Sequence, residues 1–386
     1  MTKAENPPSY PLDHLALRGA TDAPALLTGD APMSFADLDA GVGRLAAWLR
    51  AAGARPGDRV ASWSAKTRAA CLMPLAAARA GLIHVPVNPL LKAPQVAHIL
   101  ADSGAALLLT NRARADMLGD GLPGGCALRD LTAVEAAIDG HPERLPPSAG
   151  DPGDLVAILY TSGSTGRPKG VMLSHANLWL GAESVATYLA LGADDRVLAV
   201  LPFSFDYGQN QLLSAWYAGA AAAPLDYLAP RDVVKAVARH GATTLAGVPP
   251  LWVQLVEVDW PVDVAASLRR LTNSGGALTP SLIDAMRATF VEADIYPMYG
   301  LTEAFRSTWL DPALVAAHPT SMGRAIPHAE ILVCRPDGSI TADGEAGELV
   351  HCGPLVAQGY WRDAERTAER FRAAPAASMW GGTAVW

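Results

Sequence analysis

The chain has 386 residues and a mass of 40.3 kDa, which is enough for two to four packed units. Half of the residues are hydrophobic and the mean hydropathy is +0.16, so the composition excludes a disordered chain. A net charge of −8 argues against a nucleic-acid-binding protein, which usually carries a basic surface.

The first 150 residues alternate helical and strand patterns. Ser34, with Asp37 three residues later, predicts the start of an amphipathic helix over 36–52. The elements that follow are predicted as strand, helix, strand, helix and strand over residues 59–64, 67–80, 84–87, 95–102 and 106–110. This alternation is typical of a largely parallel sheet that is covered by helices.

A Gly-, Pro- and charge-rich segment, 111–150, is predicted to be a surface connection. The alternation then resumes, with predicted strands near 155–159, 197–201, 221–225, 243–248, 268–273 and 295–298. Helices are predicted near 175–190, 231–240 and 281–290. After residue 320, short strands over 329–335, 347–352 and 356–361 predict a smaller β unit.

The cysteines and the hydrophobic pattern indicate a cytoplasmic protein. The four cysteines lie far apart and form no C-x-x-C pair, so we expect reduced thiols; they are Cys71, Cys126, Cys334 and Cys352. No apolar run reaches the roughly 18–20 residues of a membrane span, and the first fifteen residues lack the apolar segment of a signal peptide.

The most informative segment is 160–170, Tyr-Thr-Ser-Gly-Ser-Thr-Gly-Arg-Pro-Lys-Gly, directly after a predicted buried strand. Its glycines allow close approach of backbone N–H groups to an anion, its hydroxyls can donate further hydrogen bonds, and Lys169 adds a positive charge. It differs from a Walker A loop because Pro168 precedes the lysine and the next helix begins later, with Ser174 as its predicted cap. A phosphate-binding loop is favoured over a flexible Gly/Ser turn.

Several other motifs occur in a fixed order along the chain, at 34–38, 57–61, 95–110, 273–277, 299–303, 347–349 and 359–361. Together with 159–170 they resemble the motifs of the adenylate-forming superfamily of acyl-CoA synthetases, luciferases and peptide-synthetase adenylation domains. The resemblance implies an α/β fold in which two helix-covered, mostly parallel sheets pack together beside a small β-barrel-like subdomain. It also implies a first α/β subdomain over 1–150, a second over 151–320 with the phosphate loop and the acid pocket, and a β subdomain over 321–386.

Enzymes of this superfamily join a carboxylate to ATP, release pyrophosphate and pass the acyl group to a thiol. By resemblance, Lys169, Thr302 and Glu303 are catalytic, Thr302 contacts the α-phosphate, and Glu303 binds Mg²⁺. The implied ATP-binding residues are Thr161, Ser162, Gly163, Ser164, Thr165, Gly166, Lys169, Gly275, Gly276, Ala277, Tyr299, Gly300 and Thr302. Glu303 also follows a predicted strand at the carboxyl edge of a parallel sheet, where ligands of α/β proteins bind, although a lone glutamate there would more often be a solvated surface residue.

The segment 201–208 departs from the acyl-CoA synthetase pattern, in which a histidine is common near Phe205. Amino-acid-activating domains instead carry Phe-Asp, and their aspartate pairs with the α-amino group of the substrate. Because a carboxylate in this apolar stretch needs a cationic partner, Asp206 favours an amino-acid substrate. The alternatives are a helix cap or an internal partner such as Arg306.

The same segment resembles free-standing ligases that load proline onto carrier proteins, and also acyl-CoA ligase-like proteins of exopolysaccharide-export clusters. Positions in the family pattern add further candidates for the acid pocket, each of which could equally be ordinary core. These candidates, with Phe205 and Asp206, are Tyr207, Gln209, Val248, Trp252, Ser274, Met298 and Arg306.

The family's smaller C-terminal domain carries a lysine that bridges the carboxylate and the α-phosphate. This chain has five lysines and none after Lys235, so we expect a large domain without that lid, which binds ATP and its acid but turns over slowly. The expected function is activation of a proline-like amino acid for a carrier-protein phosphopantetheine, without nucleic-acid or membrane partners. The alternatives are an acyl-CoA synthetase for a non-amino acid, with CoA as the acceptor, and a non-catalytic nucleotide-binding module.

Overall fold

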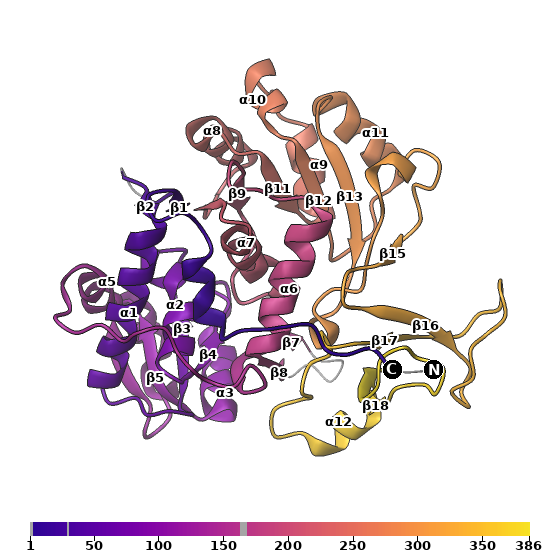
Figure 1. Cartoon of the computed structure of the whole chain (residues 1–386). Helices are drawn as coiled ribbons and strands as arrows, with labels where there is room; N and C mark the ends of the chain where they lie inside the picture. Colours follow the sequence, from indigo (N-terminus) through magenta and orange to yellow (C-terminus); the bar gives the residue numbers. More distant parts are fainter. Residues whose placement is uncertain (1–2, 29–30, 163–167) are drawn as a thin grey trace.

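The computed structural model describes residues 3–28, 31–162 and 168–386, and three β-sheets organise them (Figure 1). A six-stranded sheet with its helices forms one lobe, most of which is drawn in purple in Figure 1, and a nine-stranded sheet forms the second. A four-stranded antiparallel sheet lies beside them. This arrangement confirms the predicted fold class of two mostly parallel, helix-covered sheets with a small β part.

The six-stranded sheet has the order β6-β5-β3-β4-β7-β8, and all neighbouring pairs are parallel except β7–β8. Its strands are β3 (Arg59–Trp63), β4 (Ile83–Pro86), β5 (Ala105–Thr110), β6 (Ala127–Asp130), β7 (Leu155–Ser162) and β8 (Pro168–Ser174). The helices of this lobe are α1 (Phe35–Ala51), α2 (Arg68–Arg79), α3 (Ala93–Ser103), α4 (Arg112–Leu118) and α5 (Leu131–Gly140).

The nine-stranded sheet has the order β15-β14-β13-β12-β11-β9-β10-β1-β2, with a parallel centre from β13 to β1. Its strands are β1 (Pro24–Leu26), β2 (Met33–Ser34), β9 (Arg196–Ala199), β10 (Ala221–Pro224), β11 (Thr244–Gly247), β12 (Arg270–Asn273), β13 (Asp294–Tyr299), β14 (Thr308–Trp309) and β15 (Arg324–Ala325). The helices of this part of the chain are α6 (His175–Tyr188), α7 (Asp206–Tyr217), α8 (Pro230–His240), α9 (Pro249–Val256), α10 (Val262–Ser267) and α11 (Pro280–Thr289).

The small sheet has the order β16-β17-β19-β18, and its strands are β16 (Glu330–Cys334), β17 (Glu348–Cys352), β18 (Phe371–Ala373) and β19 (Thr383–Val385), with α12 (Ala364–Arg370) before β18. Four short 3₁₀ helices complete the described elements: η1 (Leu12–Leu17), η2 (Gly119–Gly121), η3 (Thr302–Ala304) and η4 (Pro312–Leu314). The N-terminal segment lies beside this sheet, because the Ala4 N–H donates to the Met379 carbonyl at 2.8 Å.

Two predictions of local structure were wrong. The segment 111–150 is not only a connection, since it contains α4, β6 and α5; Asn111 and Asp130 cap the two helices by accepting hydrogen bonds from backbone N–H groups. The segment 356–361 is not a strand, and only Tyr360 forms an isolated bridge, with Val171. In 111–150, the glycines and prolines that suggested a continuous loop lie between short helices and a short strand.

The sheets exchange strands along the chain. β1 and β2 belong to the nine-stranded sheet although they precede the first lobe, and β7 and β8 belong to the six-stranded sheet although they follow residue 150. β15 likewise joins the nine-stranded sheet after residue 320. The division into 1–150, 151–320 and 321–386 therefore stays a proposal about chain segments, which the sheets cross in three places.

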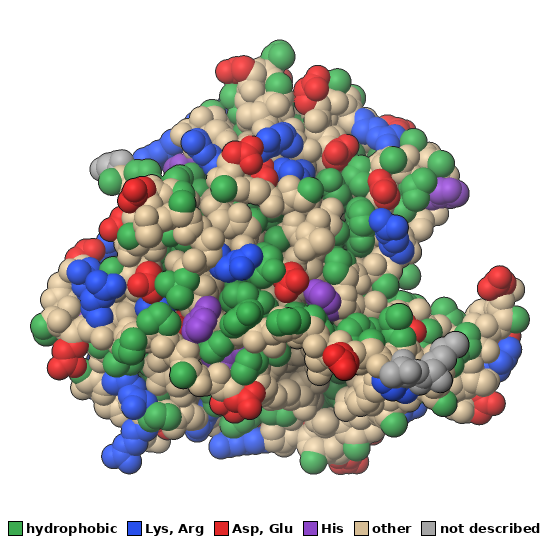
Figure 2. Space-filling view, in the orientation of Figure 1, with side chains coloured by type: hydrophobic (Ala, Val, Ile, Leu, Met, Phe, Trp, Pro, Cys, Tyr) green, Lys and Arg blue, Asp and Glu red, His purple; other side chains and the backbone are tan. Residues whose placement is uncertain are grey.

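Buried side chains connect the two large sheets. One hydrophobic cluster includes residues of α1, α2, β7, α6, α7 and β9. In the described part of the chain, no helix combines the length and the apolar character that crossing a membrane requires. On the face drawn in Figure 2, acidic and basic side chains are interspersed, without one large basic field.

Candidate active site

The hairpin β7–β8 positions Lys169 opposite Thr161, with which it pairs across the two strands. The Lys169 ammonium donates to Glu303 Oε1 at 2.8 Å and to the Tyr360 hydroxyl at 2.9 Å. The Tyr360 hydroxyl donates in turn to the same Glu303 oxygen at 2.7 Å. Three side chains from β8, η3 and the segment before α12 thus meet at one point, which joins two of the predicted catalytic residues.

The charge of Glu303 is maintained by these partners. Burial alone would raise the pKa of this carboxyl, but the hydrogen bonds from Lys169 and Tyr360, together with the lysine charge, lower the pKa below its ordinary value. Burial and the contact with Glu303 raise the pKa of Tyr360, so its hydroxyl stays a donor. Glu303 is therefore an ionised carboxylate next to a fixed cation.

The phosphate loop lies only partly within the described residues. Gly163, Ser164, Thr165 and Gly166 lie outside them, and Ser162 is described only through its backbone, which pairs with Pro168. Thr161 is described, and its buried Oγ1 has no hydrogen-bond partner among the described residues. A buried hydroxyl without a partner is available to a ligand oxygen.

A second set of predicted residues lines one pocket at the carboxyl ends of β12 and β13. Gly275 has a φ of +79°, a conformation that favours glycine, and Asn273 Nδ2 donates to the Gly276 carbonyl at 2.8 Å, which fixes the turn. The predicted ATP-binding residues in this pocket are Gly275, Gly276, Ala277, Tyr299 and Gly300. Segment 319–322 and four further residues complete the wall: Asn273, Leu278, Pro297 and Met298.

Asp206 occupies the first turn of α7, at the carboxyl edge of the same parallel strands. It is buried, with 5% of its surface exposed, and its Oδ1 accepts a hydrogen bond from Thr302 Oγ1 at 2.9 Å. Gly208 allows this placement, since a Cβ there would lie 2.0 Å from the Pro202 carbonyl oxygen. Thr302 therefore contacts Asp206 on one side and precedes Glu303 in the chain.

Asp206 faces an internal cation. Arg306 Nη2 lies 4.0 Å from Asp206 Oδ2, so the internal partner that the sequence left open is present, although beyond hydrogen-bonding distance. Burial raises the pKa of Asp206, and Arg306 and Thr302 offset part of that shift.

A small cavity behind α7, called the α7 cavity below, has room for about 20 Å³, roughly one water molecule. Three predicted pocket residues line it, Tyr207, Met298 and Arg306. The Tyr207 hydroxyl also lies 2.6 Å from Thr272 Oγ1.

The remaining pocket candidates do not line this cavity. Trp252 is fully buried in the core and packs edge-on against Phe290, and Val248 borders a separate groove between the two large sheets. Phe205 is partly exposed at the start of α7. Gln209 and Ser274 are buried, and the amide of Gln209 has no partner among the described residues.

Sequence reasoning did not single out several residues that the structure brings into the site. Tyr360 belongs to the motif 359–361, but no role was predicted for it from the sequence. Its place in that motif was the available signal. Asn210 and Thr244 line the α7 cavity, and each carries a buried oxygen without a partner in the described chain. Nothing in their local sequence distinguishes them from core residues.

Comparisons with known proteins agree with this geometry. A sequence profile of the family described as AMP-binding enzyme matches residues 12–361. A feruloyl-CoA synthase from Amycolatopsis sp. is 34% identical over 358 residues, which cover 92% of this chain and 72% of that protein. An L-proline–L-prolyl-carrier protein ligase from Streptomyces coelicolor is 32% identical over 369 residues, covering 89% of this chain and 69% of the ligase.

Solved structures of similar proteins show the same fold. VinN is 28% identical, with a TM-score of 0.86, and the match covers 95% of this chain and 94% of VinN. A structure of VinN in complex with L-aspartate is 25% identical in its match, with a TM-score of 0.84 and 98% of each chain covered.

The fold places a glycine-lined pocket, and near it the buried Asp206 with its donor Thr302, at the carboxyl ends of the parallel strands, which is the ligand-binding edge of an α/β protein. The chain belongs to the AMP-binding enzyme family. Membership supports ATP binding and ATP-dependent adenylation of a carboxylic acid. The CoA synthase and the carrier-protein ligase differ by two percentage points in identity, which is too little to choose between their substrates.

Proposed function

We propose that this protein activates an amino acid as its adenylate and transfers it to the phosphopantetheine thiol of a carrier protein. The observation that carries the proposal is the buried Asp206 carboxylate beside the α7 cavity. Its Oδ2 has no hydrogen bond in the described part of the chain, and burying a carboxylate is unfavourable unless a donor reaches it. A substrate ammonium group would supply that donor.

Thr302 connects this position to the nucleotide side of the site. Because it donates to Asp206 and directly precedes Glu303, an acid held at Asp206 lies beside the side chains proposed to contact phosphate. Positioning of this kind converts a two-molecule reaction into one within a complex and contributes much of the rate. Lys169 and Thr161 would hold phosphate oxygens, and the glycine-lined pocket would take the adenine beside Tyr299.

Glu303 fits the proposed magnesium ligand. Lys169 and Tyr360 contact its Oε1, and no hydrogen bond to Oε2 is seen in the described residues. Magnesium in phosphate-transfer sites is usually bound by one or two carboxylates and the substrate phosphates. No cluster of three metal-ligating side chains occurs in the described chain. Magnesium bound there would neutralise charge on the phosphates.

The solved complex of VinN with L-aspartate supports an amino acid as the substrate, as does the similarity to the prolyl-carrier ligase. The runner-up is an acyl-CoA synthetase for a non-amino acid. The feruloyl-CoA synthase similarity favours it, and so does Arg306, since an internal cation already faces Asp206.

Thermal-shift measurements with ATP and MgCl₂ test the proposal, using twenty amino acids and a set of unaminated acids. A ligand at 100 times its Kd adds about 2.7 kcal/mol to the folded state, which is readily measured. We expect an amino acid to give the largest shift, and Asp206→Asn to abolish that shift. The exposed Asp116→Asn is the matched control. A shift only with unaminated acids would refute the proposal.

A further inference from the structure

Arg306 is a buried cation whose donors are almost all unused. Its side chain is 2% exposed, and its Nε has no hydrogen-bond partner among the described residues. Its nearest carboxylate oxygen, on Asp206, is 4.0 Å away, which is too far for a hydrogen bond. A guanidinium has five N–H donors and stays charged in proteins, so burial without acceptors is unfavourable.

The backbone holds Arg306 in this position. Phe305 has φ +61° and ψ −71°, and the Arg306 N–H donates to the Ala304 carbonyl at 2.7 Å, which together form a γ-turn with positive φ. This strained conformation is stabilised by the buried Phe305 ring, which lies over Gly181; a Cβ on Gly181 would be 2.5 Å from the ring. The guanidinium itself lies over the Tyr207 ring, 4.4 Å from its centroid.

The unused donors belong to Arg306, the one charged side chain among the described residues that line the α7 cavity. The Asp206 carboxylate lies next to Arg306, in the first turn of α7, and is not part of the cavity lining. Asn210 and Thr244 add buried oxygens without partners in the described chain. An apolar or purely cationic substrate would leave Arg306 unsatisfied, which is unfavourable for a buried charge.

We propose that Arg306 binds a second carboxylate of the substrate, so that the protein selects an amino dicarboxylic acid. The ammonium group would lie at Asp206, one carboxylate at Arg306, and the other carboxylate on the Thr302 side, where it is adenylated. Arginine suits this task because its planar guanidinium matches a carboxylate with two parallel hydrogen bonds. The proposal rests on the proposed function and narrows its substrate class from amino acids in general to acidic amino acids, in place of the proline-like acid expected from the sequence.

Four small acids separate the two charged groups. L-Aspartate has both an ammonium and a second carboxylate, L-asparagine has only the ammonium, succinate has only the second carboxylate, and butyrate has neither. Their Kd values are measured by calorimetry in the presence of ATP and MgCl₂. We expect aspartate to bind at least about tenfold more tightly than asparagine, because a hydrogen-bonded charge pair contributes that much. Equal affinity of aspartate and asparagine would refute the role of Arg306.

Substitutions assign the preference to the side chain. Arg306→Gln should reduce the aspartate-to-asparagine ratio to about one, and Arg306→Lys should keep part of it, since lysine retains the charge without the planar fork. Arg112→Gln, at an exposed side chain, is the matched control and should leave the ratio unchanged. If Arg306→Gln folds poorly, the wild-type ligand series and Arg306→Lys still decide the question. A preserved ratio in Arg306→Gln would overturn the inference.

The same series separates the two proposals. Tight succinate binding that depends on Arg306 but not on an ammonium would support the second-carboxylate site while refuting amino-acid activation. Tight asparagine binding equal to that of aspartate would leave amino-acid activation intact and refute the second-carboxylate site. Weaker binding of aspartate than of an apolar amino acid such as proline would likewise refute the acidic-substrate inference.

Discussion

Asp206 combines two properties that rarely occur together, deep burial and a cation too distant for hydrogen bonding. Its charge therefore depends on Thr302, on the Arg306 field and on a ligand. The raised pKa follows from burial, which the internal partners offset only in part. A carboxylate in this state is a sensitive point of the site, because its protonation removes the acceptor that the proposed ammonium needs.

We predict that amino-acid binding weakens on acidification at a higher pH than an ordinary aspartate would allow. The sign follows from the raised pKa, since Asp206 takes up its proton before unperturbed aspartates do, and the protonated carboxyl cannot pair with an ammonium. Kd values across the acidic range would test this. Asp206→Asn should bind weakly at every pH, with a flat profile over the same interval; an equally steep profile in that variant would contradict the assignment.

At the scale of elements, Lys66 joins the two large sheets. Its ammonium donates to the Val200 carbonyl at 2.9 Å and the Leu225 carbonyl at 2.8 Å, which follow β9 and β10. Asp226 adds an ion pair at 3.3 Å and accepts the Lys66 backbone N–H at 2.7 Å. The loop that begins at Val200 leads into α7, so this contact positions the segment that carries Asp206.

We predict that Lys66→Met lowers the free energy of unfolding by about 2 to 4 kcal/mol, because the two carbonyls and Asp226 lose a charged donor while the apolar stem is kept. Urea denaturation gives the value. Lys235→Met, at an exposed position on α8, should change stability by less than about 0.5 kcal/mol. Similar losses in both variants would argue against a specific role for Lys66.

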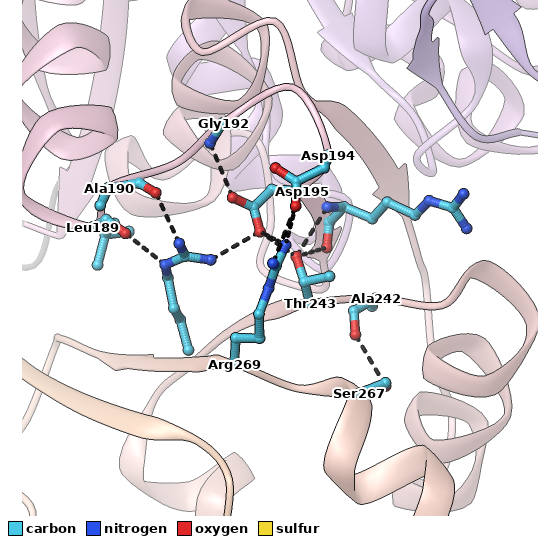
Figure 3. Close-up of polar contacts among 11 residues, drawn as sticks. Leu189, Ala190, Gly192, Asp194, Asp195, Ala242, Thr243, Ser267 and Arg269 are labelled. Carbon is cyan, nitrogen blue, oxygen red and sulfur yellow. Dashed lines mark hydrogen bonds and ion pairs between the residues drawn. The ribbon is translucent and has the colours of Figure 1, made fainter.

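A second group of charged side chains lies at the amino ends of β9, β11 and β12, opposite the site, and links these strands. Figure 3 shows the side chains of Asp195 and Arg269 directed toward each other. Arg269 Nη2 donates a hydrogen bond to Asp195 Oδ1 at 2.6 Å. Asp195 also accepts hydrogen bonds from Arg270 (2.8 Å), Thr243 Oγ1 (2.7 Å) and the Gly192 N–H (2.9 Å). Arg270 in turn caps the end of α6 through the Leu189 and Ala190 carbonyls.

Asp195→Asn is expected to destabilise the protein by about 3 to 5 kcal/mol at neutral pH, because it leaves Arg270 without its buried anionic partner. Burial opposes ionisation of Asp195, yet Thr243, Gly192 and the two arginines lower its pKa. The stabilisation is therefore present above the unfolded pKa of about 3.9 and is lost as pH falls through the lowered folded pKa. Urea denaturation at neutral and acidic pH should show the difference shrinking. The exposed neighbour Asp194→Asn is the control, and a pH-independent difference would contradict the assignment.

At the scale of the whole molecule, one hydrophobic cluster joins the two lobes, because it includes residues from both large sheets and the helices between them. We therefore predict a single cooperative thermal transition for the two lobes, in which near- and far-ultraviolet circular dichroism coincide. Two separated transitions would show that the lobes unfold independently, and that the shared core contributes little.

The strand and helix rhythm predicted most of the architecture, because parallel sheets produce continuous apolar runs separated by amphipathic helices. β3, α2, β4, α3 and β5 lie within one or two residues of their predicted bounds. α7 was missed, because a helix buried on all sides, with Gln209, Asn210 and Gln211 inside, shows no amphipathic stripe.

The exchange of β1, β2, β7 and β8 between lobes could not be predicted either, since pairing partners far apart in sequence leave no local signal.

For the site, the structure brings Lys169 and Glu303 into contact and gathers the glycine-rich turn with Tyr299 in one pocket, while the roles assigned to these residues stay predictions. The motifs could not give the Asp206–Arg306 separation, which depends on a γ-turn at Phe305 that no sequence pattern predicts. Trp252, another predicted pocket residue, is fully buried and packs against Phe290, and its role in the pocket stays a prediction.

The hydrogen bond from Thr302 to Asp206 has a thermodynamic consequence. One residue contacts the proposed acid-binding carboxylate and is adjacent to the carboxylate proposed to bind magnesium with the phosphates. Binding of the acid and binding of the nucleotide therefore act on the same short segment, so the affinities for the two ligands should be linked. By reciprocity, whatever factor the nucleotide introduces into the affinity for the acid, the acid must introduce into the affinity for the nucleotide.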